Sequence, residues 1–413
     1  MCASHHARMN ATATPCLHIE RYPAAQQSLR VAVVTETYPP EVNGAAITIE
    51  RLVRGLQDRN HDMQVIRPRQ DAQDRHDNRA GLEQVLMRGL PIPQYPHLRV
   101  GLPAQQSLLR LWSLRRPDLV HIATEGPLGW SALKAARKLK LPVSSDFRTN
   151  FHAYSQHYGA AWLHKAIAAY LRKFHNRADC TMVPTSWLQT ELGAMGFERL
   201  HVVARGVDSQ RFNPAHRSAR LRADWGVGED DLVVLSVGRL AAEKNLSLLI
   251  RAYEAMQQVN PRAQLVLVGD GPERDAIAAR CPQAVLAGAR RDAELLSHYA
   301  SADVFLFPSL TETYGNVTPE AMASGLALLA FDCAAAGQLI QHGHNGLLAP
   351  VADAEAFVRR AQDLATQPAL VQTLRQRARQ TTESLDWSAI VRQVEGLWMT
   401  LLQQAARQAA HKV

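Results

Sequence analysis

The sequence predicts an α/β protein built from two Rossmann-like domains. Two parts of the chain begin in the same way, with a short buried strand, a loop that contains glycine, and a helix. The first begins at Leu29 and the second at Leu232. A length of 413 residues fits two or three domains of ordinary size. We therefore expect two parallel sheets, each with helices on both faces.

Composition favours a globular cytosolic protein. Hydrophobic residues make up 46% of the chain and charged residues 20%, which is ordinary for an α/β protein. No apolar run reaches the length of a membrane-spanning helix, and the first residues lack a secretion signal. Residues 1–28 show no periodicity and predict a disordered extension. The cysteines are scattered and predict reduced thiols rather than a disulfide framework: Cys2, Cys16, Cys180, Cys281 and Cys333.

Positive charge is concentrated in the first half of the chain. Residues 1–200 hold 25 Lys and Arg against 16 Asp and Glu, whereas the remainder holds 21 against 22. Such a surplus suits an anionic membrane, a nucleic acid or a polyanionic substrate. An arginine-rich surface without a ligand explains it equally well.

The most informative stretch runs from Phe307 to Gly325. The apolar run Asp303–Pro308 predicts a buried strand that ends at proline. Thr318 is expected to cap a short helix that Gly325 ends, and Leu326–Phe331 predicts the next strand. Further on, the sequence predicts a turn at Gly343–Pro350, helical structure over Glu355–Arg379, and a last helix from Leu385 to about Ala409.

A strand, a loop and a helix N-terminus in this order form a typical anion site at the carboxyl edge of a sheet. The backbone N–H groups of Gly315, Asn316 and Val317 are expected to face a phosphate. Glu312 and Glu320 are separated by seven residues, one before the helix and one in its first turn. Both carboxylates can therefore face the same cleft.

Two cations follow the strand Leu232–Val237. Arg239 comes after Gly238, and Lys244 lies five residues further on, before the helix Ser247–Gln257. A diphosphate is bound best by fixed donors and positive charge together. The spacing therefore predicts a diphosphate site.

The segment PSLTETYGNVTPEAMASGLALLA resembles the Glu-x7-Glu signature of glycosyltransferase family 4, retaining enzymes of the two-domain GT-B fold. Gly238, Arg239 and Lys244 match the Gly-Arg-x-x-x-x-Lys motif of the same family. The resemblance covers about residues 30–400. It implies that Glu312 approaches the donor sugar, that Glu320 binds the nucleotide ribose, and that the two domains face each other across a cleft.

The resemblance also assigns other donor contacts. Gly288 and Arg290 match the strand and loop that hold the nucleotide base, and Tyr314 belongs to the donor loop. The loop Tyr38–Gly44 is similar to the family loop that lies against the donor phosphate and the acceptor. Gly44 is expected to contact the donor, and Asn43 replaces the first glycine of that loop.

One position departs from the family pattern. Arg148 stands where many members carry a histidine that contacts the donor sugar, and His152 is the nearest histidine. His152 and Tyr154 are candidates for the sugar or acceptor side. Arginine stays charged and cannot relay a proton, so Arg148 is expected to act in the active site by binding an acidic group. The candidate groups are the donor diphosphate, an anionic acceptor head group, and a carboxylate such as Glu36.

The resemblance implies an acceptor-side domain at 29–204, a donor-binding domain at 205–385, and a C-terminal helix over 386–413 that packs back on the first domain. It implies a hexosyltransferase that acts on a lipid or glycan acceptor without a cofactor, a metal or a nucleic acid partner. Subgroup similarity favours GDP-mannose, with a UDP-sugar such as UDP-sulfoquinovose or UDP-glucose as the alternative. The expected location is the cytoplasm, with peripheral association at the inner face of the membrane.

Two other classes of function fit less well. A Rossmann oxidoreductase needs a strand followed by GxGxxG and an acidic residue about 20 positions on, and no strand here has both. A sugar-nucleotide-binding protein without turnover would not need Glu312 together with Arg239 and Lys244.

Overall fold

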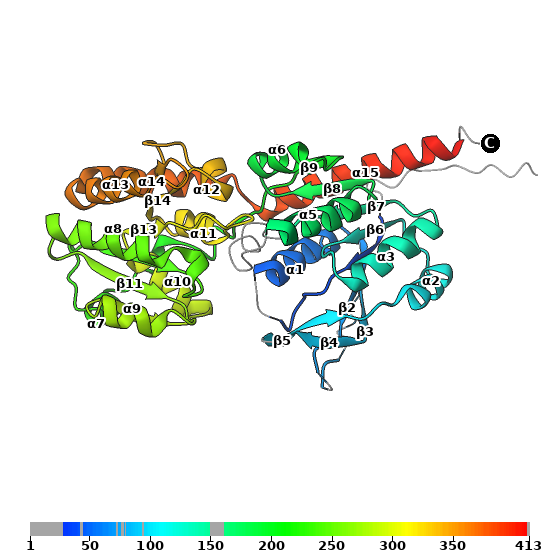
Figure 1. Ribbon diagram of the computed structural model, residues 1–413, viewed down its shortest axis with the longest axis horizontal. Coiled ribbons are helices and arrows are strands. Elements are labelled where there is room, and N and C mark those ends of the chain that lie inside the picture. The colour runs from blue at the N-terminus through cyan, green and yellow to red at the C-terminus, as the bar shows by residue number, and fades with distance from the viewer. Residues whose placement is uncertain are drawn as a thin grey trace, which may run out of the picture.

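The computed structural model describes residues 28–41, 44–71, 73–75, 78, 80–92, 95–148 and 161–410. The predictions made for residues 1–27, Asn43, His152 and Tyr154 lie outside these ranges. The chain forms two α/β units that lie side by side (Figure 1), with residues of the first and second halves in separate sheets.

The first unit contains a seven-stranded parallel sheet with the order β3-β2-β1-β6-β7-β8-β9. Its five inner strands are largely buried, as parallel strands covered by helices should be, whereas the edge strands β3 and β9 are partly exposed. The strands are β1 (Arg30–Val34), β2 (Asp62–Pro68), β3 (Leu82–Met87), β6 (Leu119–Ile122), β7 (Val143–Asp146), β8 (Cys180–Val183) and β9 (Leu200–Val202).

The helices of this unit cross between neighbouring parallel strands, and an antiparallel ribbon adds β4 (Gly89–Ile92) and β5 (Tyr95–Gly101). The helices are α1 (Gly44–Gln57), α2 (Gln105–Leu114), α3 (Pro127–Lys138), α5 (Ala161–His175) and α6 (Ser186–Ala194).

The second unit contains a six-stranded parallel sheet with the order β12-β11-β10-β13-β14-β15. In both sheets the chain begins at a central strand, adds strands toward one edge and then adds the remaining strands on the other side of the first strand. This is the strand order of a dinucleotide-binding Rossmann fold. The strands are β10 (Val233–Val237), β11 (Gln264–Val268), β12 (Val285–Gly288), β13 (Val304–Phe307), β14 (Ala327–Phe331) and β15 (Leu347–Ala349).

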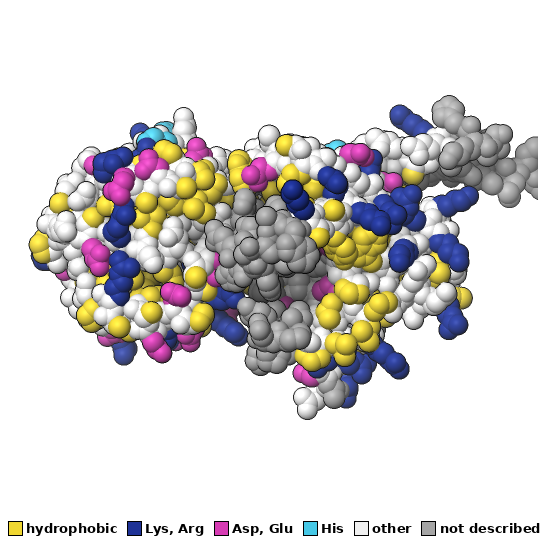
Figure 2. Space-filling view, in the orientation of Figure 1, with side chains coloured by type: hydrophobic (Ala, Val, Ile, Leu, Met, Phe, Trp, Pro, Cys, Tyr) yellow, Lys and Arg dark blue, Asp and Glu magenta, His cyan; other side chains and the backbone are white. Residues whose placement is uncertain are grey.

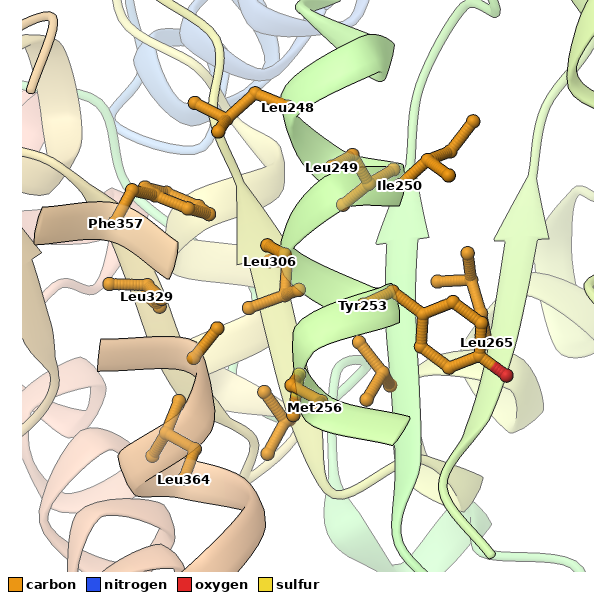
Figure 3. Packing of buried hydrophobic residues seen from close by; sticks show 14 of the residues in the cluster. Leu248, Leu249, Ile250, Tyr253, Met256, Leu265, Leu306, Leu329, Phe357 and Leu364 are labelled. Atoms are coloured by element: carbon orange, nitrogen blue, oxygen red, sulfur yellow. The ribbon is translucent and has the colours of Figure 1, made fainter. Parts of the chain in front are cut away.

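Helices cover both faces of this second sheet. On one face, α8 and α13 pack together over the strands, and Figure 3 shows Met256 of α8 and Leu364 of α13 pointing into that layer. The helices are η1 (Pro214–His216), α7 (Ala219–Asp224), η2 (Ala242–Lys244), α8 (Leu246–Val259), α9 (Arg274–Arg280), α10 (Asp292–Ser301), α11 (Val317–Ala323), α12 (Ala334–Leu339), α13 (Ala354–Thr366) and α14 (Pro368–Glu383).

The last helix, α15 (Trp387–Ala410), returns to the first unit and runs along it (Figure 1). Val391, Val394 and Trp398 are buried in the same core cluster as α1 and the first sheet. Glu395 also accepts a hydrogen bond from Arg59 and pairs with the buried ring of His61 at 2.9 Å. The α/β class, the two Rossmann-like domains and the returning C-terminal helix are thus confirmed.

One local prediction was wrong and two were incomplete. Asn316, not Thr318, is the N-cap of α11, and Thr318 is buried inside the helix. The segment Gly343–Pro350 contains β15 as well as a turn, and the helical stretch Glu355–Arg379 is divided between α13 and α14. Proline cannot continue a helix, and Pro368 accordingly starts α14.

Candidate active site

The candidate donor residues lie where the second sheet reverses its strand order, between β10 and β13. Gly238 follows β10 and Pro308 follows β13, so both loops leave the carboxyl edge of the sheet side by side. Two hydrogen bonds join them: Thr311 Oγ1 donates to the Glu243 carbonyl, and Asn245 Nδ2 donates to the Pro308 carbonyl. Ligands of open α/β sheets bind in the crevice at such a reversal point.

Arg239 and Lys244 lie at this edge and each is paired with a carboxylate. The Arg239 Nε donates to Glu243 Oε1 at 3.1 Å, and its guanidinium is half-exposed. The Lys244 ammonium forms an ion pair with Glu312, whose carboxylate also accepts from Ser309 Oγ at 3.0 Å. A diphosphate that binds here therefore has to replace or share the carboxylate partners of both cations.

Glu320 occupies the first turn of α11, as predicted. It is only partly exposed, and Tyr299 Oη, which is buried, donates to Glu320 Oε2 at 3.0 Å. Burial raises the pKa of Glu320 to about 7, although Tyr299 and the charges of Arg51 and Arg211 act in the opposite direction. The carboxyl can thus accept or donate a hydrogen bond near neutral pH.

The raised pKa predicts how stability depends on pH. The unfolded chain releases this proton near 4.5 and the native chain near 7, so the native state binds more protons in between. Glu320 therefore lowers the free energy of unfolding as pH rises through that window. We expect Glu320→Gln to remove this loss, because an amide stays neutral and its oxygen still accepts from Tyr299.

Urea denaturation at pH 5.0 and pH 8.0 measures this effect. The difference between wild type and Glu320→Gln isolates Glu320 from Glu36, whose pKa burial also raises to about 7. Glu320→Gln should gain stability relative to wild type at pH 8.0. An equal difference at both pH values would contradict the raised pKa.

The other donor candidates surround these groups. Gly315 adopts a positive φ of 85°, which favours glycine. A Cβ on Gly44 would lie 3.3 Å from Asn316 Nδ2, so the first loop of one domain meets the donor loop of the other. Val317 begins α11 and packs on the core.

Gly288 ends β12, and Arg290 lies two residues beyond it. Arg290 Nε donates to the Ala287 carbonyl at 2.8 Å, and its Nη1 pairs with Glu294 at 3.3 Å. Arg290 is therefore fixed beside the end of the strand that, by resemblance, carries the base site.

Tyr314 links the donor loop to the segment between the domains. Its side chain is buried, and its hydroxyl donates to the Arg205 carbonyl at 3.0 Å while the Arg205 guanidinium lies over its ring. Beside it, Thr313 Oγ1 donates to the Arg148 carbonyl at 3.3 Å. The backbone at Arg148 thus contacts the donor loop.

The Arg148 side chain pairs with Asp146, not with Glu36. Asp146 ends β7, only two residues before Arg148. Glu36 instead accepts hydrogen bonds from the backbone N–H groups of Gly101 and of Leu128, the latter at 3.2 Å, so its carboxylate is already satisfied. The carboxylate that pairs with Arg148 is therefore Asp146 and not Glu36. The other two candidate partners, the donor diphosphate and an anionic acceptor head group, stay predictions.

Sequence reasoning overlooked Asp146, Glu243 and Tyr299. Glu243 could have been found, because it lies four residues after Arg239 and one before Lys244. Asp146 lies two residues before Arg148, which was also a usable signal. Nothing in the sequence marks Tyr299, which reaches Glu320 only because α10 and α11 pack side by side. Among the described residues, no group of three His, Cys, Asp or Glu side chains is placed to hold a metal ion.

Two Rossmann-like domains together with the paired Glu-x7-Glu and Arg/Lys elements define a GT-B glycosyltransferase. Family models agree: residues 42–211 match "Glycosyltransferase Family 4" and residues 231–367 match "Glycosyl transferases group 1". The chain belongs to glycosyltransferase family 4.

Curated relatives include a GDP-mannose-dependent alpha-mannosyltransferase of Corynebacterium glutamicum, 35% identical over 79% of this chain and 78% of that protein. A protein of the same name from Mycobacterium tuberculosis is also 35% identical, over 79% of this chain and 85% of that protein. The sulfoquinovosyl transferase of Arabidopsis thaliana is 29% identical over 87% and 71% of the two chains.

Solved structures share the fold at lower identity. Sucrose-phosphate synthase from Thermosynechococcus elongatus has a TM-score of 0.73 and 19% identity, over 91% of this chain and 100% of that one. Anabaena HepE, solved in complex with UDP and glucose, has a TM-score of 0.68 and 18% identity, over 89% and 99%. The chain is thus a nucleotide-sugar hexosyltransferase of the family 4 type.

Proposed function

We propose that the protein transfers mannose from GDP-mannose to a lipid or glycan acceptor with retention of configuration. The observation that carries this proposal is the pair of cations, Arg239 and Lys244, at the edge of the second sheet next to Glu312. They are placed to stabilise the diphosphate as it leaves, and such stabilisation is usually the largest electrostatic contribution to catalysis. No divalent ion is needed in this scheme.

In the proposed reaction, the bond from the sugar anomeric carbon to the donor phosphate breaks. The acceptor oxygen forms its bond to that carbon on the same face, and the departing phosphate takes the acceptor proton. Glu312 orients the donor sugar, and Glu320 binds the ribose hydroxyls. The backbone of Arg148, which contacts the donor loop, borders the sugar site.

The donor nucleotide is the least constrained part of the proposal. Relatives at 35% identity are named as GDP-mannose-dependent, whereas the sulfoquinovosyl transferase, at 29% identity, keeps a UDP-sugar as the second candidate. A thermal-shift panel of GDP, UDP, ADP, GDP-mannose, UDP-glucose and UDP-sulfoquinovose separates them. A ligand at a hundred times its dissociation constant stabilises a protein by about 2.7 kcal/mol. Stabilisation by UDP-sugars alone would overturn the GDP-mannose proposal.

A hollow of about 920 Å³ on the first unit supports an acceptor rich in hydroxyl groups. Tyr38, Pro39 and Pro40 border it, so it adjoins the loop that leads to Gly44. Carboxylates and guanidiniums, which bind the hydroxyls of sugars and polyols well, make up much of its wall: Glu50, Arg54, Asp58, Arg67, Asp71, Asp74 and Arg75.

The surface of the first unit supports a membrane-bound acceptor. Figure 2 shows Lys and Arg side chains gathered over this unit beside hydrophobic side chains. Leu114 at the end of α2 is 87% exposed, and Tyr170 on α5 is 44% exposed. The same region of the chain carries many exposed cations, on or next to α2, α3 and α5: Arg110, Arg115, Arg116, Lys134, Arg137, Lys138, Lys165, Arg172 and Lys173. None of the described helices is long and apolar enough to cross a membrane.

We predict salt-sensitive binding to anionic membranes. Each cation near a negative surface contributes about 1 kcal/mol, and screening at high salt removes that attraction. Cosedimentation at low salt should therefore recover the protein with phosphatidylglycerol vesicles and not with phosphatidylcholine vesicles. Leu114→Ser should weaken binding, and Val259→Ser, at an exposed position of the second unit, should not. Equal recovery with both kinds of vesicle would show that the surplus positive charge does not bind the protein to anionic membranes.

A further inference from the structure

The carboxyl end of β7 contains an arginine that is only partly satisfied. The Arg148 side chain is 7% exposed and pairs with Asp146 through Nη2. Its Nε and Nη1 atoms are buried, and neither has a hydrogen-bond partner among the residues that the structure describes. Buried guanidinium nitrogens without acceptors are costly, so they indicate that something else satisfies them.

A second arginine adds to the local positive charge. The Arg205 guanidinium lies over the Tyr314 ring, at 5.6 Å from its centroid, in the segment between the domains. Burial and then the charge of Arg148 lower the pKa of Arg205 to about 10, and Asp146 acts in the opposite direction. Two guanidinium groups therefore share one neighbouring carboxylate, which leaves about one unbalanced positive charge.

A small cavity lies at these three side chains. Its volume is about 20 Å³, which is enough for one particle of about the size of water. Asp146, Arg148 and Arg205 line it, and the rest of the wall is largely apolar, with Leu52 of α1 and Ile390 of α15. The cavity thus lies between the first sheet, α1, α15 and the segment that leads to the second unit.

We propose that this cavity binds a single monovalent anion of the size of chloride. An anion accepts from the Arg148 nitrogens and cancels the excess charge, whereas a water molecule satisfies the hydrogen bonds but leaves the charge. A phosphate or sulfate ion is too large for the space. The site differs from the diphosphate site, which is built on Arg239 and Lys244 in the second unit.

The bound anion would also support the donor loop. Arg205 holds Tyr314 through its carbonyl and its guanidinium, and the Arg148 carbonyl accepts from Thr313. Removing the anion leaves two like charges close together below this loop. We therefore expect chloride to lower the KM for the donor at constant ionic strength. This consequence depends on the proposed function, but anion binding itself does not.

Thermal unfolding tests the site without any donor. At constant ionic strength, replacing gluconate by chloride or bromide should raise the Tm of wild type saturably, by about 1–3 °C. Arg148→Gln should lose this shift, because it removes both the charge and the free donors. Asp146→Asn should enlarge the shift, because it increases the unbalanced charge. A purely structural role for these residues does not predict opposite changes.

Arg67→Gln is the matched control. Arg67 is equally buried but fully paired with Asp74, so the variant should melt earlier and keep the halide shift. Crystals soaked in bromide should show an anomalous peak next to Arg148 Nη1. Absence of the peak together with a halide-independent Tm would overturn the proposal. Stabilisation by sulfate and not by halides, lost in Arg148→Gln, would overturn it too, because the site would then hold a larger oxyanion.

Discussion

Lys244→Ala is expected to lower kcat/KM for the donor by about one to two orders of magnitude. A hydrogen bond to a charged group contributes about 1.5–3 kcal/mol, and each 1.36 kcal/mol corresponds to a factor of ten in rate. Truncating Lys244 removes its contact with the diphosphate and also its ion pair with Glu312. Arg239→Ala should cost less, since Arg239 is more exposed than Lys244.

Glu312→Ala separates the two roles of this pair. Without the carboxylate, Lys244 has no competing partner, so GDP should bind at least as tightly as to wild type. Turnover should fall sharply, because Glu312 is the group assigned to the sugar. Calorimetry with GDP and steady-state rates with GDP-mannose measure the two effects. A parallel loss of both would show that Glu312 does not act on the sugar.

Arg251→Ala is a suitable control for these variants. Arg251 forms an exposed ion pair with Glu355 in the same unit, at 2.6 Å. Exposed pairs contribute about 0–1 kcal/mol, so this variant should keep wild-type stability and kinetics. If Lys244→Ala behaved like Arg251→Ala, the diphosphate assignment would be wrong.

The sequence predicted most of the strands because buried parallel strands are short apolar runs. The predicted strands Leu232–Val237 and Leu326–Phe331 each begin one residue before the observed β10 and β14 and end at the same residue. The region from Leu82 to Leu114 received no prediction, although it contains β3, β4, β5 and α2. Prolines interrupt the β4–β5 ribbon, and only two side chains of α2 are buried. Neither the alternating pattern of a strand nor the 3.6-residue repeat of a helix is therefore clear in this region.

The site was predictable where spacing along the chain carries the geometry. Glu312, Glu320, Arg239 and Lys244 were proposed as site residues because they lie in the loops and the helix turn that follow β10 and β13 and because they match motifs of the family. Their actual partners depend on the three-dimensional structure: Tyr299 reaches Glu320 from another helix, and Arg205 comes close to Arg148 because β9 and β7 lie in the same sheet, separated only by β8. For Arg148 the carboxylate named among three candidate partners was Glu36, whereas the ion pair is formed with Asp146, two residues away.

Asp303→Ala is expected to lower the free energy of unfolding of the second unit by about 3–5 kcal/mol, the usual cost of removing one partner of a buried ion pair. Asp303 directly precedes β13, the strand that ends at the donor loop. Its carboxylate, 9% exposed, accepts from Arg222 at 3.2 Å and from the Val233 backbone N–H at 3.0 Å. It also pairs with Arg217 at 3.2 Å and Arg375 at 2.9 Å.

The physical reason for the large effect is the charge that remains. Arg222 is 1% exposed, and without Asp303 its guanidinium keeps backbone carbonyl acceptors but no carboxylate. Asp303→Asn should cost less, because the amide oxygen still accepts one of these bonds. Glu355→Ala, which breaks only an exposed pair, is the control and should change stability by less than about 1 kcal/mol. Urea denaturation followed by tryptophan fluorescence compares the three variants. Equal urea midpoints for Asp303→Ala and Glu355→Ala would show that the ion pairs of Asp303 with Arg217, Arg222 and Arg375 do not stabilise the second unit.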